Sequence, residues 1–279
     1  MKDKIANITK KLVERDMIWN FFWPFVKASN YIQYHRRVSQ SIMDQQKVDD
    51  RIIKIINQPI VKHGPFKGLK YPSFKSYGST LYPKLIGSYE AELHAVIERT
   101  CSKTYAVILD IGSAEGYYAV GLAMKHKGVP TYAFDIDETA NIACSEMAVL
   151  NNVKDQIRVE YRCSAETLAK FDFNGKGLIV CDCEGYEKEL FNEHNLANLK
   201  NCDLLIETHD FIDIDISDYL KSLFNKTHNI TSIYSLDDIV KARSYQYPEL
   251  VDLSLSDKRE ILAEKRPAIM EWLYLEPKL

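Results

Sequence analysis

The chain has 279 residues, ordinary apolar content, 17 tyrosines and a formal net charge of −3. That length allows one large domain, or one domain with a sizeable extension. The near-neutral charge excludes the basic surplus typical of nucleic-acid-binding proteins, so we expect no nucleic-acid partner. The 6 cysteines are scattered without zinc-ligand spacing, and we expect reduced, mostly buried thiols.

The first 60 residues predict a helical extension, with apolar side chains at helical spacing. Charges run throughout the start, MKDKIANITKKLVERD, which predicts no signal peptide and a cytoplasmic protein. Pro24 is expected to interrupt or restart the helix, because proline cannot donate to the preceding turn.

An aromatic stretch, MIWNFFWPFV at residues 17–26, is the most apolar part of the chain. It covers about half of the roughly 20 residues that a bilayer crossing needs, so we expect no transmembrane segment. Lys10, Lys11, Arg15 and Lys27 lie nearby. Three roles remain open for it: a lid over an acceptor pocket, the interface of a homodimer, or a peripheral membrane anchor.

Residues 61–86 change character, because glycine, proline, tyrosine and lysine dominate them. Such turn signals predict short strands or an ordered loop. We therefore expect two parts. Residues 1–87 form the extension and its loop segment, and residues 88–279 form the main domain.

From Ser88 onward, strands and helices alternate. A helix is expected over 88–100 with Ser88 as its N-cap, and others over 117–126, 139–152, 187–194 and from about Ser217. This alternation predicts a Rossmann-like three-layer α/β sandwich around a mostly parallel, seven-stranded sheet. The expected strands are 105–110, 131–137, 157–163, 177–182, 202–210, 230–235 and 269–276.

The loop after the first strand, within AVILDIGSAEGYYAVGLA at 106–123, is typical of a ligand site. Gly112 and Gly116 would let the backbone approach a ligand closely. Their spacing is G-x-x-x-G and not the G-x-G-x-x-G of dinucleotide sites. Asp110 and Glu115 would repel a pyrophosphate but suit an ammonium and a sulfonium. The loop therefore predicts S-adenosylmethionine as cofactor.

The next two strands supply further candidates. Asp135, at the end of the second strand, would accept hydrogen bonds from ribose hydroxyls. Asp137 is a second candidate, or the cap of the following helix. At the end of the third strand, Ser164 and Ala165 would lie against the adenine.

Three segments resemble class I S-adenosylmethionine-dependent methyltransferases, and most of all the FkbM-like family. They are VILDIGSAEGYYAVGLA, TYAFDID and GLIVCDCEGYEKELF. The family's D-x-G-x-x-x-G falls on Asp110, Gly112 and Gly116, its strand-two acid on Asp135, and its D-x-E-G on Asp182, Glu184 and Gly185.

This resemblance implies an enzyme that O-methylates a hydroxyl of a sugar, glycan or other small metabolite, with S-adenosylhomocysteine as product. It also implies an antiparallel last strand, and a segment around Glu90 that closes over the cofactor. The predicted cofactor-binding residues are Glu90, Asp110, Gly112, Ser113, Glu115, Gly116, Tyr117, Asp135, Ile136, Ser164, Ala165 and Asp182.

A second group of polar residues follows the fourth and fifth strands. Asp182, Glu184, Glu207, His209 and Asp210 should meet at one edge of the sheet. We predict His209, Asp182 and Glu207 as catalytic, with His209 or a nearby carboxylate as a metal-free general base. In the alternative, Asp182, Glu184 and Glu207 hold a divalent cation of the Mg²⁺ type, which lowers the pKa of a bound hydroxyl.

Two other functions stay open at this point. One is a nicotinamide-dependent oxidoreductase, which the missing third glycine and the acidic loop disfavour. The other is a non-catalytic cofactor-binding or interaction protein that docks a partner through its aromatic stretch. Near the C-terminus, Arg243, Tyr245, Tyr247 and Arg266 are candidates to face an acidic acceptor.

Overall fold

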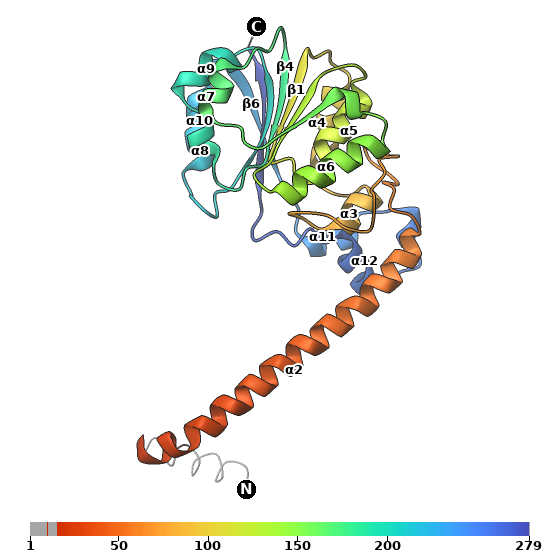
Figure 1. Cartoon of the computed structure of the whole chain (residues 1–279), viewed down its shortest axis with the longest axis vertical. Coiled ribbons are helices and arrows are strands. Elements are labelled where there is room, and N and C mark those ends of the chain that lie inside the picture. The colour runs from red at the N-terminus through yellow and green to blue at the C-terminus, as the bar shows by residue number, and fades with distance from the viewer. Residues whose placement is uncertain (1–9, 11–15, 279) are drawn as a thin grey trace. The chain divides into compact units, whose positions relative to one another are not determined.

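The structure is a computed structural model that describes residue 10 and residues 16–278 (Figure 1). The chain divides into two compact units, Met1–Ile55 and Ile56–Leu279. Residues 61–87 thus belong to the second unit, whereas the expected boundary between residues 87 and 88 stays a prediction. Lys11 and Arg15, two expected neighbours of the aromatic stretch, lie outside the described residues.

Helix α2 (Asp16–Ile56) makes up most of the described part of the first unit. It runs through Pro24, so the expected interruption there was wrong. Proline removes only one backbone hydrogen bond, the one to the carbonyl of Asn20. Asn20 is exposed, so water can satisfy that carbonyl. Within the described residues, no helix combines the length and the apolar character needed to cross a bilayer.

The described part of the second unit contains one seven-stranded sheet in the order β3-β2-β1-β4-β5-β7-β6. Neighbouring strands from β3 to β5 pair in parallel, whereas β7 is antiparallel to both β5 and β6. The expected Rossmann-like sheet with an antiparallel last strand is confirmed. The strands are β1 (Val107–Ile111), β2 (Thr131–Phe134), β3 (Ile157–Glu160), β4 (Gly177–Cys181), β5 (Asp203–Thr208), β6 (His228–Tyr234) and β7 (Glu271–Pro277).

Burial follows the place of each strand in the sheet. The central strands β1, β4 and β5 are buried at every residue, as expected of parallel strands covered on both faces. The edge strand β3 alternates between less and more exposed positions, and β6 is exposed at most of its residues. The hydrophobic core therefore lies along the middle of the sheet and supports the carboxyl ends of β1, β4 and β5.

Helices cover both faces of the sheet, with α4, α5 and α6 on one side and α7 to α10 on the other (Figure 1). Beyond the carboxyl ends of the strands lie α3, α11 and α12, of which α12 contacts the other two. The helices of this unit are α3 (Leu81–Ile86), α4 (His94–Cys101), α5 (Tyr117–Lys125), α6 (Glu138–Leu150), α7 (Ala165–Lys170), α8 (Glu187–Leu190), α9 (Glu193–Leu199), α10 (Ile216–Phe224), α11 (Asp238–Ser244) and α12 (Leu255–Leu262); short 3-10 helices span Ala91–Leu93, Lys154–Gln156 and Pro248–Leu250.

Three local expectations were wrong. Ser88 does not cap a helix, because its hydroxyl donates to the carbonyl of Pro83 and the left-handed Glu90 delays the helix to residue 91. The segment 187–194 is not one helix, since Asn192 leaves helical geometry and caps α9. Residues 61–80 form the expected loop, with an isolated bridge from Lys70 to Ile60, but residues 81–86 form helix α3, which was not expected.

The cysteines follow the expectation for a reduced protein. All six are free thiols, and four of them are buried. Cys181 and Cys183 lie on the same side of the chain after β4, with their sulfur atoms 3.5 Å apart.

Candidate functional site

The loop after β1 adopts a conformation that requires glycine. Gly112 has φ +82°, and a Cβ there would lie 1.6 Å from the backbone oxygen of Asp182. Gly116, with φ +94°, is the N-cap of α5, and a Cβ there would lie 2.8 Å from Sγ of Cys144. Asp182 also donates its backbone N–H to the carbonyl of Ile111 at 2.9 Å. The glycine loop therefore lies directly against the segment that follows β4.

A cavity of about 590 Å³ lies at the carboxyl ends of β1, β2 and β4. Aromatic and aliphatic side chains form much of its lining, with a few acidic groups among them, as in sites for small molecules. The predicted cofactor-binding residues that line it are Asp110, Gly112, Ser113, Tyr117, Asp135, Ile136 and Asp182, whereas Glu90, Glu115, Gly116, Ser164 and Ala165 do not.

Three buried polar atoms of described residues that line this cavity have no hydrogen-bond partner in the protein. They are Oδ2 of Asp110, Oγ of Ser113 and Oδ1 of Asp182, the last of which lies 3.4 Å from Nε2 of His209. Burial, reinforced by the charges of Asp182 and Asp135, raises the pKa of Asp110 to about 8. A cationic group bound beside Asp110 would compensate the cost of its charge.

Asp135 follows β2, lines the cavity and supports the glycine loop. Its Oδ2 accepts the backbone N–H of Ala114, and its Oδ1 accepts that of Asp137, each at 2.8 Å. Ala114 has φ +45°, so the first bond stabilises a strained residue. Each oxygen keeps a further lone pair for a ligand hydroxyl. Asp137 has the capping role, since its carboxylate accepts the N–H of Thr139 at 2.7 Å.

Ser164 and Ala165 lie at the start of α7. Ser164 caps this helix in a reciprocal pair with Thr167. Tyr161 and Cys163, slightly earlier in the chain, line the cavity instead. The sequence could have indicated Tyr161 and Cys163, because side chains directly after a parallel strand face the ligand edge of the sheet and β3 ends at Glu160.

Glu115 is paired within the protein. Its carboxylate accepts hydrogen bonds from Lys84 Nζ at 2.7 Å, Ser76 Oγ at 2.6 Å and the N–H of Tyr77 at 3.0 Å. Burial opposes the charge of Glu115, but Lys84 and these donors outweigh it, so the pKa is lowered. Lys84 itself lines the cavity, a role that the sequence did not suggest.

Glu90 is also paired. It accepts hydrogen bonds from the hydroxyl of Tyr118 and from the guanidinium of Arg266. Burial raises the pKa of Glu90 to about 7, although Arg266 opposes the shift. Arg266, expected to face an acidic acceptor, contacts Glu207 and Glu264 as well and is largely buried.

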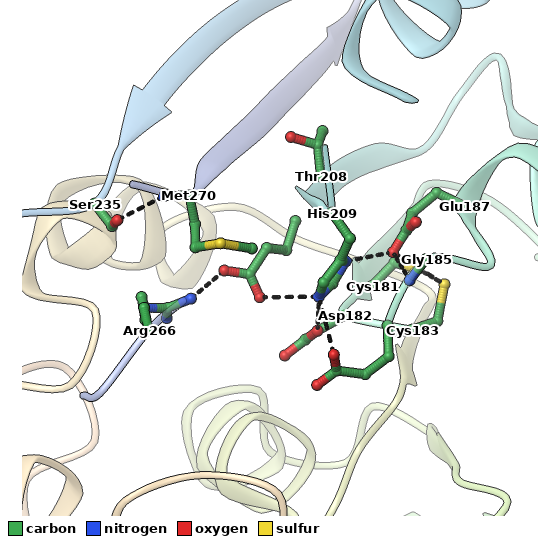
Figure 2. A network of polar contacts seen from close by, with 12 residues as sticks. Cys181, Asp182, Cys183, Gly185, Glu187, Thr208, His209, Ser235, Arg266 and Met270 are labelled. Carbon is green, nitrogen blue, oxygen red and sulfur yellow. Dashed lines mark hydrogen bonds and ion pairs between the residues drawn. The ribbon is translucent and has the colours of Figure 1, made fainter. Parts of the chain in front are cut away.

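His209 lies at the centre of the predicted catalytic group (Figure 2). Its Nδ1 is 2.7 Å from Oε1 of the fully buried Glu187. Its Nε2 faces carboxylate oxygens of Asp182 at 3.4 Å, Glu184 at 3.5 Å and Glu207 at 3.9 Å. The structure thus brings together every residue predicted for catalysis or metal binding, and it adds Glu187, which the sequence did not suggest.

These carboxylates determine the charge of the imidazole. Burial lowers the pKa of His209, but hydrogen bonds and charges from Asp182 and Glu187 outweigh burial and raise it to about 11. With no cation beside it, the imidazole is then protonated at neutral pH and acts as a donor. Burial and the nearby Asp182 raise the pKa of Glu207 well above its usual value. His209 as general base stays a prediction.

The same residues fit a divalent cation. Ligand atoms of Asp182, Glu207 and His209 all lie within 4.8 Å of one another. The bond between Nδ1 and Glu187 fixes the ring with Nε2 toward the two carboxylates, as in the carboxylate–histidine pairs of metal sites. Asp182 also lines the cavity, so a cation here would lie at its edge.

Neither the protein-family models nor the curated proteins include a match to this chain. Solved structures similar to it include S-adenosylmethionine-dependent methyltransferases. One, from Geobacter sulfurreducens in complex with S-adenosylhomocysteine, is 11% identical over 68% of this chain and 91% of its own, with a TM-score of 0.42. A putative O-methyltransferase from Klebsiella pneumoniae is 10% identical over 82% and 90%, with a TM-score of 0.45. The MccD protein is 13% identical over 68% and 97%, with a TM-score of 0.40.

Proposed function

We propose that this chain is an S-adenosylmethionine-dependent methyltransferase that methylates a hydroxyl of a sugar, glycan or other small metabolite. The observation that carries the proposal is the buried carboxylate of Asp110, whose unpartnered oxygen belongs to the lining of a cavity at the carboxyl edge of the sheet. A ligand with an ammonium group would pair this carboxylate. The amino-acid part of S-adenosylmethionine carries such a group.

The residues of the cavity fit the remaining parts of this cofactor. Asp110 and Ser113 would bind its amino-acid part, and Asp135 would accept hydrogen bonds from its ribose hydroxyls. Ile136 and Tyr161, both exposed at the cavity, would pack against its adenine. When bound, the cofactor supplies a methyl group on a sulfonium, whose thioether leaves without needing an acid.

The acceptor would bind where the cavity meets the His209 cluster. Carboxylates only accept hydrogen bonds, so this edge suits an acceptor that presents hydroxyl donors. Asp182, half-buried in the cavity lining, would orient the reacting hydroxyl and accept its proton. His209 would position Asp182 through Nε2, while Glu187 fixes the imidazole ring.

A cation-assisted route is the second candidate, favoured by the three converging ligand atoms of Asp182, Glu207 and His209. A divalent cation held there would lower the pKa of an acceptor hydroxyl. Methyl transfer measured with and without EDTA separates the two routes. Activity lost in EDTA and restored by Mg²⁺ supports the cation, whereas activity unchanged by EDTA supports Asp182 acting alone.

Two other functions fit the site less well. A nicotinamide-dependent oxidoreductase would place a pyrophosphate beside the glycine loop, where Asp110 would repel it. A non-catalytic binding protein has no need for a buried, unpartnered acid beside a second cluster of acids, because both arrangements cost stability.

The first experiment is a calorimetric titration with S-adenosylhomocysteine and, separately, with NADH. We expect the wild-type protein to bind S-adenosylhomocysteine and not to bind NADH. Asp135→Ala should bind it about 5 to 100 times more weakly, because ligand hydroxyls lose their acceptor and the glycine loop loses a support. Asp237→Ala is the matched control, since that exposed carboxylate caps α11, does not line the cavity, and its loss should leave affinity nearly unchanged. Binding of NADH, or of neither ligand, would refute the proposal.

A further inference from the structure

The first turns of α2 carry an exposed aromatic surface, residues 18–25. Phe21 and Phe25 are 68% and 67% exposed, Phe22 52% and Trp23 46%. Exposed large apolar side chains in one short segment mark an interaction surface, because their contact with water is costly.

These side chains cover a broad arc of the helix. Ile18, Phe21, Phe22 and Phe25 follow the spacing that places residues on one helical face. Trp19 and Trp23 extend this face sideways, and their rings lie 5.2 Å apart. The surface is therefore wide and aromatic, unlike the narrow aliphatic seam of a coiled coil.

Apart from Asp16 at the start of α2, the charges along residues 16–43 are positive. Between Asp16 and Asp44 the chain contains no aspartate or glutamate. Lys27, Arg36 and Arg37 are the cations of the same stretch, and all three are exposed. A partner that fits must offer an apolar layer next to negative charge.

A second copy of the helix fits these residues poorly. A heptad repeat that starts at Ile18 keeps an unbroken series of apolar residues only as far as Ile32. Its next core positions would fall on His35, Ser39, Ile42 and Gln46, of which only Ile42 is apolar. Polar residues at successive core positions would destabilise a coiled coil along the rest of α2.

We propose that residues 18–37 bind the surface of an anionic membrane. Tryptophan and phenylalanine side chains partition into the boundary between headgroups and acyl chains, and arginine and lysine pair with anionic headgroups. The helix would lie in the plane of the interface, with residues 18–25 inserted and the cations at the headgroups. Each exposed cation near such a surface adds to the attraction, which salt screens.

The tryptophans of the chain provide a direct readout. The chain has 3 tryptophans, two of them in the aromatic surface. The third, Trp272, is completely buried in β7 and should not respond. We expect the full-length protein to float with phosphatidylcholine vesicles that contain phosphatidylglycerol, with a blue shift of tryptophan emission. Vesicles of phosphatidylcholine alone, or raised salt, should reduce binding.

Two double variants keep the tryptophans and separate the possible surfaces. Phe21→Ser with Phe25→Ser should weaken vesicle binding at least about tenfold, since two large apolar side chains no longer insert. Phe211→Ser with Ile214→Ser removes a comparable exposed pair from the other unit and should bind like wild type. If anionic vesicles leave flotation and emission unchanged, or if only the control pair loses binding, the proposal is wrong. A dimer that the first pair of substitutions dissociates, without vesicle binding, would assign the surface to a second copy instead.

Discussion

Replacing Asp110 by asparagine should strengthen the fold and weaken the ligand site together. Asp110 is buried at the end of β1, and its pKa is raised from 3.8 to about 8. A raised carboxyl pKa means that the folded state holds its proton to higher pH than the unfolded state does. Stability is therefore lost as pH rises from about 4 to about 8, the reverse of an ordinary paired aspartate.

The size of the effect follows from the difference between the pKa of Asp110 in the folded and in the unfolded chain. A tenfold difference in proton affinity corresponds to about 1.4 kcal/mol. Folding at pH 7 must therefore reprotonate Asp110, which is ionised in the unfolded chain, and this costs roughly 4 kcal/mol of folding stability. Asp110→Asn removes this cost. In urea unfolding, the free energies of wild type and variant should coincide near pH 4, apart from a constant offset. They should then separate by about 1 kcal/mol per pH unit up to pH 8.

Ligand binding should release the proton that Asp110 holds in the folded protein. At pH 7 an acid with a pKa of about 8 is about nine-tenths protonated, so pairing Asp110 with an ammonium should release close to one proton. Calorimetry of S-adenosylhomocysteine in buffers of different ionisation enthalpy measures that release. Affinity should rise up to about tenfold per pH unit from pH 6 to 8 and be low at every pH in Asp110→Asn. Parallel stability curves for the two proteins, together with pH-independent binding, would refute this account of Asp110.

Three further predictions concern residues that shape or form the site. Gly112→Ala should lower the free energy of unfolding, measured in urea, by roughly 2–5 kcal/mol, because the added Cβ would overlap the backbone oxygen of Asp182. Gly68→Ala, also at positive φ but in open space, should lower it by only about 1 kcal/mol. Equal losses in the two variants would contradict the overlap. Lys84→Met should lower the free energy of unfolding by roughly 3–5 kcal/mol, because it leaves the charge of the buried Glu115 without its cation. Adding Glu115→Gln should restore part of that stability. A double variant no more stable than Lys84→Met would show that the ion pair is not the cause. His209→Ala should reduce methyl transfer by about 100-fold or more while S-adenosylhomocysteine affinity changes less than about threefold, and normal turnover in that variant would remove His209 from the reaction.

The sheet was predictable because its strands are continuous apolar runs that end in polar residues. The apolar runs are residues 107–109, 178–181 and 204–206, and each is followed directly by an acid, Asp110, Asp182 or Glu207. Alternation with helices favours parallel pairing of these strands. The errors fall where one residue decides the local backbone. Glu90 leaves helical geometry where its carboxylate binds the distant Tyr118 and Arg266, which periodicity along the chain does not record. Asn192 does so as a local cap, through its contacts with His194 and Asn195.

The candidate site was predictable where its residues follow strands. Asp110, Asp135, Asp182 and His209 meet at one edge because the carboxyl ends of parallel strands do so. Their partners were not predictable. Glu187, the first residue of α8, reaches His209 from the segment that follows the neighbouring strand β4. Lys84 reaches the glycine loop from α3, which lies before the first strand in the chain.

The contact between Lys84 and Glu115 has a consequence for how the chain can be divided. Residues 61–87 look like a connector by composition, yet they supply Tyr77, Lys84 and the hydrogen bonds that close one wall of the cavity. A shortened protein that begins at Ser88 would keep every strand of the sheet but lose that wall, and Glu115 would lose its cation and its hydrogen-bond donors. The smallest piece able to hold a ligand is therefore larger than the sheet and its helices, and it includes residues that precede the first strand.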